Sequence, residues 1–213
     1  MKNERDYTAS SHKKNLLILV AVILFVIVVL AIFVVMAGKR MEGFSPDEEL
    51  IAEYYEQHKD LFKTPDFQKK AEDDESYMQD YDRRIYYLDG PIRSELLPDE
   101  DLPMPALSPI VNMITYMIAG DSNAYNTLFS TSYIAEKGLQ DAFTAQKPYN
   151  IEIAYMGASN GSHLFRLNYC LKDNDGTLRK DILSDMSRAL NITVTVQNDA
   201  YYINSVGYHF ASR

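Results

Sequence analysis

The chain has 213 residues, with 30 Asp and Glu against 21 Lys and Arg and a formal net charge of −9. An acidic protein is repelled by phosphate backbones, so we expect no nucleic-acid partner. Cys170 is the only cysteine, which excludes an intramolecular disulfide and leaves stability to a hydrophobic core.

The N-terminal part predicts a membrane anchor. Residues 16–37 are 22 consecutive positions without a charge, and as a helix they would reach roughly 33 Å, enough to cross a bilayer core of about 30 Å. The run exceeds the apolar region of a signal peptide, which is about 7–15 residues, so we expect it to stay in the lipid bilayer. Four basic residues precede the run and two follow it. This bias places residues 1–15 in the cytoplasm and the rest of a single-pass protein outside. The lack of disulfides outside the membrane fits a bacterial surface better than an animal secretory route, so we expect the cell envelope of a bacterium.

An acidic segment follows the anchor. Residues 41–101 carry 19 acidic and 7 basic residues, a net charge of −12. We interpret residues 41–90 as an acidic, partly helical stalk, whose charge forms either a solvated surface or a docking surface for a basic partner. Helical spacing places seven residues on one face, which we predict to meet a protein partner: Leu50, Ile51, Tyr54, Tyr55, His58, Leu61 and Phe62.

Prolines mark the next boundary. Five of the eight prolines lie between positions 91 and 109, and proline interrupts both helices and central strands. We therefore predict a stiff linker at residues 91–107 and a separate domain at residues 108–213. This domain should begin with a helix at Ser108-Pro109 that ends at Gly120, followed by one or two shorter helices.

In the last third of the chain the hydrophobic pattern changes to a period of two residues, which is typical of strands. Apolar residues alternate with polar ones over 151–155, 163–171 and 190–197, and "AYYINSVGYHF" follows. Asn160-Gly161 and Asn198-Asp199 are turn dipeptides between these runs. The order of elements predicts an α+β fold in which helices pack on one face of a curved antiparallel sheet.

This order of elements resembles the nuclear transport factor 2-like superfamily, through "IVNMITYMIAGDSNAYNTLFSTSY" and the closing "NITVTVQNDAYYINSVGYHF". The resemblance implies a cone-shaped fold. In bacteria, similar domains behind one N-terminal span occur as scaffold subunits of conjugation and type IV secretion machines and as other envelope proteins. Such cones often hold a pocket between helix and sheet, which six residues could line here: Tyr116, Tyr155, His163, Tyr169, Tyr202 and His209.

Motifs with catalytic chemistry are missing from the sequence. Asp173-Asn174-Asp175-Gly176 resembles the start of a calcium loop, but Ser184 stands where the twelfth, ligating residue is needed. We expect instead a tight turn between a strand ending at Leu171 and one starting near Thr177. Cys170 could pair with His163 or His209 only if the fold aligned them, and its strand register favours an inert thiol. We expect no metal, no cofactor and no enzymatic activity.

Three functions remain open. The first is a non-catalytic interaction or scaffold domain of a bacterial envelope or secretion assembly, with an envelope protein as partner and a possible homo-oligomer. The second is an extracytoplasmic small-molecule binding or sensing domain that uses the cone pocket. The third is a catalytic pocket, which would need an acidic residue paired with a histidine inside the cavity.

Overall fold

The structure is a computed structural model that describes residues 48–97 and 100–208. The predicted tail at 1–15, the predicted span at 16–37 and His209 lie outside the described residues. Within the described residues, no helix is long and apolar enough to cross a membrane. All of them belong to one compact unit, Gly43–Arg213.

Six strands form one mixed sheet in the order β2-β1-β3-β4-β5-β6. Their bounds are β1 Ile85–Asp89, β2 Ile92–Leu96, β3 Pro148–Ser159, β4 Ser162–Leu171, β5 Leu190–Gln197 and β6 Ala200–Tyr208. Neighbouring strands pair antiparallel except β1 and β3, which run parallel, with Ile85 opposite Ile151. The predicted α+β class is confirmed, and the expectation of a purely antiparallel sheet is wrong at this one pair.

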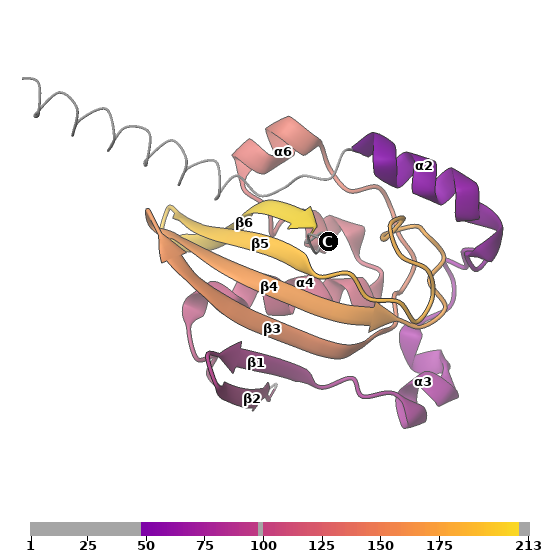
Figure 1. Ribbon diagram of the computed structural model, residues 1–213, viewed down its shortest axis with the longest axis horizontal. Coiled ribbons are helices and arrows are strands. Elements are labelled where there is room, and N and C mark those ends of the chain that lie inside the picture. The colour runs from indigo at the N-terminus through magenta and orange to yellow at the C-terminus, as the bar shows by residue number, and fades with distance from the viewer. Residues whose placement is uncertain (1–47, 98–99, 209–213) are drawn as a thin grey trace, which may run out of the picture. The chain divides into compact units, whose positions relative to one another are not determined.

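The helices are short apart from two. They are α2 Glu48–His58, α3 Glu75–Asp80, α4 Ser108–Ala119, α5 Ser122–Asn126 and α6 Thr131–Lys137, with 3-10 turns at Lys59–Leu61, Ala71–Asp73 and Pro105–Leu107. The predicted helix at 108–120 is confirmed, because α4 ends at Gly120 in the left-handed conformation with φ 68°. Figure 1 shows α4 lying behind the central strands of the sheet.

The space between α4 and the sheet is filled by side chains. Ile110, Met113, Ile114 and Met117 project from α4 at helical spacing and are at most 1% exposed. They join a core that includes Phe165, Leu167 and Ile192, each 0% exposed. Burying one such side chain contributes about 1.5–3 kcal/mol, so this layer is the main source of stability among the described residues.

The predicted boundary before residue 108 does not separate two structural parts. Strand β1 lies in the segment that we expected to be a stalk, and β2 lies in the expected linker, yet both belong to the sheet. Gly90 has φ +56° and Pro91 follows it, which makes a two-residue turn between the strands. The proline therefore sits in a hairpin turn at the sheet edge, a position that it tolerates.

The β3–β4 and β5–β6 turns agree with the sequence. Asn160 and Gly161 have φ of 51° and 76°, and Asn198 and Asp199 have φ of 51° and 62°. The expected strand near Thr177 is wrong, however, because residues 172–189 form a long connection from β4 to β5. That connection has no period of two and is held by buried polar groups.

Candidate functional site

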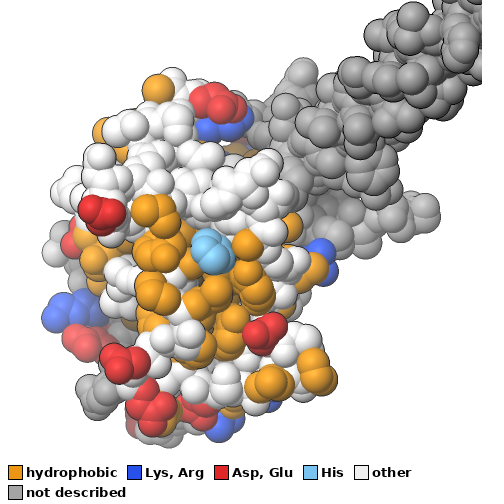
Figure 2. Space-filling view, turned by 90° about the vertical axis from the view of Figure 1, so that its left-hand side faces the viewer, with side chains coloured by type: hydrophobic (Ala, Val, Ile, Leu, Met, Phe, Trp, Pro, Cys, Tyr) orange, Lys and Arg blue, Asp and Glu red, His pale blue; other side chains and the backbone are white. Residues whose placement is uncertain are grey.

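An aromatic cluster lies at the end of the sheet where the β3–β4 and β5–β6 turns meet. The His163 ring is 6.1 Å from the Tyr155 ring and 6.2 Å from the Tyr201 ring, between centroids. Tyr201 pairs with Val196, which is 48% exposed. We call Tyr155, His163, Val196 and Tyr201 the hairpin-end patch. Figure 2 shows this end of the domain, where apolar side chains gather around a histidine.

The histidine of this patch has an unsatisfied nitrogen. Nδ1 of His163 is buried and has no hydrogen-bond partner among the described residues. A buried polar atom without a partner costs about 1–3 kcal/mol, so its retention in an apolar surface calls for an explanation. Met156, which follows Tyr155 at a β-bulge, is 45% exposed at the same end of the sheet and adds to the apolar surface there.

Among the described residues that were expected in a cone pocket, one pair forms a ring contact. Tyr155 and His163 share the hairpin-end patch. Tyr169 is 1% exposed, and its hydroxyl accepts a hydrogen bond of 2.9 Å from Arg179 within the protein. Burial raises the pKa of Tyr169. This side chain is therefore part of the core and closes the space in which a ligand was expected.

The other expected pocket residues lie elsewhere. Tyr116 is half-buried on α4 and packs against the core. Tyr202 pairs with Thr195 and so alternates with Tyr201, which places the two tyrosines on opposite faces of the sheet. His209 lies outside the described residues. The cavities described below are lined by different residues.

The predicted partner-facing helix contacts its own chain. The ring of Tyr55 lies 5.0 Å from that of Phe62, and both approach Gly176 of the connection between β4 and β5. Tyr54 stacks on His58 at 4.3 Å. Leu50 and Leu61 are 56% and 60% exposed, and Ile51 is partly buried. Part of the predicted stripe thus packs within the protein, and its remaining apolar residues face solvent.

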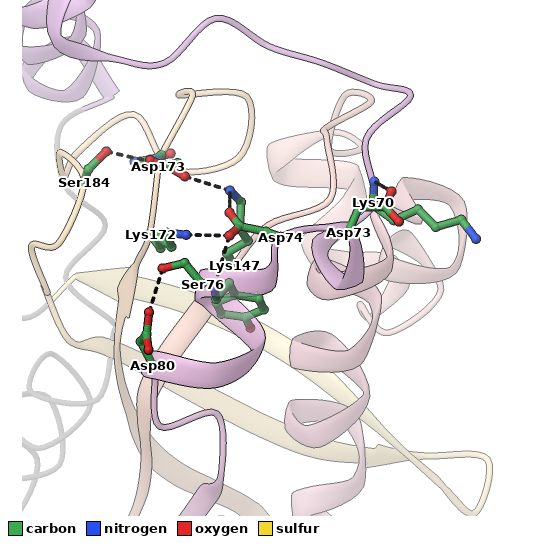
Figure 3. Close-up of polar contacts among 11 residues, drawn as sticks. Lys70, Asp73, Asp74, Ser76, Asp80, Lys147, Lys172, Asp173 and Ser184 are labelled. Carbon is green, nitrogen blue, oxygen red and sulfur yellow. Dashed lines mark hydrogen bonds and ion pairs between the residues drawn. The ribbon is translucent and has the colours of Figure 1, made fainter.

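An ion network joins α3 to the two longest strands. Lys147 and Lys172 bind the Asp74 carboxylate at 2.6 and 2.7 Å, and Lys147 also binds Asp173 at 2.8 Å (Figure 3). The Asp74, Lys147 and Lys172 side chains are only 11–13% exposed. Hydrogen bonds from the two lysines hold the pKa of Asp74 well below its usual range. Asp74 also caps α3 by accepting from the Tyr77 N–H, so the network fixes this helix on the domain.

A polar cavity of about 360 Å³ opens beside this network. Its lining comes from three separate segments: Lys63, Thr64, Asp66, Lys69, Lys70, Thr144, Ala145, Lys147, Asp173 and Asp175. We call this space the lysine cavity. Its acidic groups are already engaged, since Asp175 accepts from Thr144 and Thr177, Asp66 accepts from the Gln68 N–H, and Asp173 binds Lys147.

The remaining positive charge of the lysine cavity is at its rim. Lys63 and Lys69 are exposed and have no ion pair among the described residues, and Lys70 pairs only with the exposed Glu72. Such a site can offer ammonium and hydroxyl donors to a small anion. Sequence reasoning missed it because Lys63, Lys69 and Lys70 lie more than 70 residues before Thr144 along the chain.

Other polar groups of the domain have structural partners. Arg179 is 4% exposed, forms a two-point ion pair with Asp181 at 2.7 and 2.8 Å, and lies over the rings of Tyr169 and Tyr208. Cys170 lies one residue from Tyr169 on the opposite face of β4, away from His163, and burial raises the pKa of its thiol. The structure therefore does not align Cys170 and His163 as a nucleophile and base.

Within residues 48–97 and 100–208, no three His, Cys, Asp or Glu side chains are grouped closely enough to hold a metal ion. A larger cavity of about 570 Å³ lies beside the β1–β2 hairpin, where arginine and acidic side chains already pair with each other. Comparisons with protein-family models, curated proteins and solved structures found no significant match to this chain.

Proposed function

We propose that this protein is a membrane-anchored, extracytoplasmic interaction domain of a bacterial envelope or secretion-type assembly, and that the hairpin-end patch contacts its protein partner. In this proposal residues 16–37 cross the membrane once and residues 1–15 stay in the cytoplasm. The domain has no catalytic task and acts by presenting a rigid sheet end to another envelope protein.

The hairpin-end patch is the observation that supports this proposal. Tyr and exposed aliphatic side chains concentrate on one surface, and interface centres are enriched in such residues. The sheet holds them rigidly, because four strands converge there through two-residue turns.

The test is site-specific crosslinking of the full chain in native membranes. A photoreactive amino acid at Val196 should form one discrete adduct with another protein, whereas the same group at Leu139, which is 64% exposed outside the patch, should not. The adduct should disappear when Tyr201→Asp is added to the Val196 probe. Equal adducts from both positions, or none from Val196, would refute the patch as a protein contact.

A second candidate function is binding of a small anion, and the lysine cavity favours it. Lys63 and Lys69 leave two positive charges at the rim of a space that is large enough for a small carboxylate or phosphate compound. The packed layer between α4 and the sheet leaves this surface cavity as the better place for the small ligand that the sequence suggested for a cone pocket.

Citrate and inorganic phosphate are the probes for this candidate. At constant ionic strength either anion should raise the melting temperature of the full chain, with about 2.7 kcal/mol of stabilisation at one hundred times its Kd. Lys63→Ala with Lys69→Ala should abolish the effect. Lys59→Ala with Lys180→Ala changes the net charge equally at two exposed lysines outside the cavity and should preserve it. If both double variants lose the anion-induced rise in melting temperature equally, the rise depends on overall charge and not on the lysine cavity.

A further inference from the structure

Within the described part of the chain, strand β2 is a free edge of the sheet. It pairs with β1 on one side and ends the strand order on the other. Its first four residues are all exposed, and Ile92 is 65% exposed although its side chain is apolar. Figure 1 shows β2 at the outer border of the sheet, below β1. Such an edge presents unpaired backbone groups that can bond to another strand.

The backbone direction of β2 follows from its turn. Asp89 and Ile92 flank a two-residue turn, so they form a hydrogen-bonded pair and the pattern alternates from there. Ile92, Ser94 and Leu96 therefore direct their N–H and C=O groups toward β1. The corresponding groups of Arg93 and Glu95 point toward the free edge.

The sequence of β2 is complementary to itself in the antiparallel sense. When two copies of Ile92–Leu96 pair antiparallel about Ser94, Arg93 of each copy faces Glu95 of the other. These are the residues whose backbone groups point outward, so each opposed pair can also exchange two main-chain hydrogen bonds. On the other face Ile92 lies opposite Leu96, which covers the most exposed apolar side chain of the strand.

Other registers place like charges together. A parallel pairing, or an antiparallel pairing about Arg93, sets Arg93 against Arg93, and an antiparallel pairing about Glu95 opposes two carboxylates. Arg93 is already held on one face of the sheet, since its guanidinium lies 3.6 Å from the Tyr86 ring centroid and 3.3 Å from a Glu152 oxygen. The charges of β2 thus select one register among those that the backbone allows.

We infer that two copies of this chain associate through β2, antiparallel and centred on Ser94, so that their six-stranded sheets join into one. The occupant of the free edge is then a second copy of the chain, because the charge pattern complements itself. The inference does not depend on the hairpin-end patch or the lysine cavity, which involve other strands and loops.

Disulfide trapping in native membranes tests the register. In a full-length Cys170→Ser background, Ser94→Cys should form a covalent dimer on oxidation with copper phenanthroline, because the two Cα atoms would be about 4.5 Å apart. Ile92→Cys is the matched control. It lies on the same exposed strand, but in this register the two copies of position 92 are separated by roughly 13 Å along the strand. The control should give no dimer.

Charge reversal tests the chemistry of the interface. Added to Ser94→Cys, Arg93→Glu should reduce dimer formation roughly tenfold by opposing carboxylates, and Arg93→Glu with Glu95→Arg should restore it. Restoration cannot arise from monomer stability, because within each chain the double variant sets a carboxylate against Glu152 and a guanidinium against Arg84. Glu136→Arg on α6 is a control that should have no effect. Dimers from Ile92→Cys, no dimer from Ser94→Cys, or no rescue would overturn the inference.

Discussion

Gly120 is the position at which one methyl group should cost most. An ideal Cβ there would lie 2.8 Å from the backbone nitrogen of Ala145 and 3.1 Å from the carbonyl carbon of Thr144. The residue also has φ +68°, which L side chains rarely adopt. The close contact costs about 1–3 kcal/mol, because the contacted atoms are backbone and cannot rotate away. The positive φ costs a residue with a side chain about 1–2 kcal/mol more.

The matched control is Gly161→Ala in the β3–β4 turn. Gly161 has φ +76°, and its Cβ would meet nothing within 4 Å, so only the conformational cost of about 1–2 kcal/mol applies. Gly120→Ala should therefore lower the free energy of unfolding by about 2–5 kcal/mol, and the difference between the variants measures the close approach. Urea unfolding of the full chain in detergent, followed by near-ultraviolet circular dichroism of its 16 tyrosines, gives both values. Equal costs for the two variants would refute the argument.

Three further predictions concern buried polar groups. Asp74→Asn should destabilise the domain by about 1–3 kcal/mol at neutral pH. The pKa of Asp74 is lower in the folded than in the unfolded state, so its contribution to stability is present above the unfolded pKa and is lost as the pH falls through the folded pKa. The difference in stability between wild type and variant should therefore shrink in acid. A constant difference in unfolding measured down to about pH 2 would contradict this. Arg179→Met removes the two-point partner of the buried Asp181 carboxylate, whose remaining ion pair is the longer one to Arg188 at 3.7 Å, and should cost about 3–5 kcal/mol. Adding Asp181→Leu should recover part of this loss, and denaturant titrations that show additive losses would exclude the pairing argument. Tyr77→Phe removes a 2.8 Å hydrogen bond to the Pro148 carbonyl and should cost about 1 kcal/mol. Burial raises the pKa of Tyr77 to about 12, so wild type should lose more stability than the variant between about pH 10 and 12, and parallel stability curves over that range would count against it.

The sequence predicted the local elements of the C-terminal half well. The strands β3 to β6 follow from a period of two, and their turns follow from dipeptides that tolerate positive φ. The end of α4 follows from Gly120. Each of these features depends on residues close together in the chain, where periodicity and turn chemistry decide the backbone.

Long-range features could not be predicted in the same way. The β1–β2 hairpin has a Gly-Pro turn, a recognisable pattern with glycine at the first turn position, but the proline-rich context favoured a linker. The parallel pairing of β1 with β3 joins residues 66 positions apart, as for Ile85 and Ile151, and no local pattern encodes it. The surroundings of Tyr169 could not be predicted either, because Arg179, in a loop expected to be a strand, donates a hydrogen bond to the Tyr169 hydroxyl.

The candidate site was predicted only in part. Tyr155 and His163 were singled out and do lie together, because strand alternation places both on the same face. Val196 was part of a predicted strand, but its 48% exposure in the folded domain cannot be read from the strand pattern. The lysine cavity needs three segments whose proximity arises from packing, so charge counting along the chain could only suggest a solvated acidic stalk.

The parallel pair of β1 and β3 also sets an order of events during synthesis. The hairpin of β1 and β2 is made before any of the helices α4, α5 and α6, and its sheet partner follows only after them. Until β3 is available, Tyr87 has no core to enter, although it is 6% exposed in the folded domain. Contacts this distant in sequence slow folding, because the intervening chain must close first. The ribosome therefore releases the edge hairpin β1–β2 before the strand β3 with which it pairs. The hairpin can join the sheet only as a late step of folding.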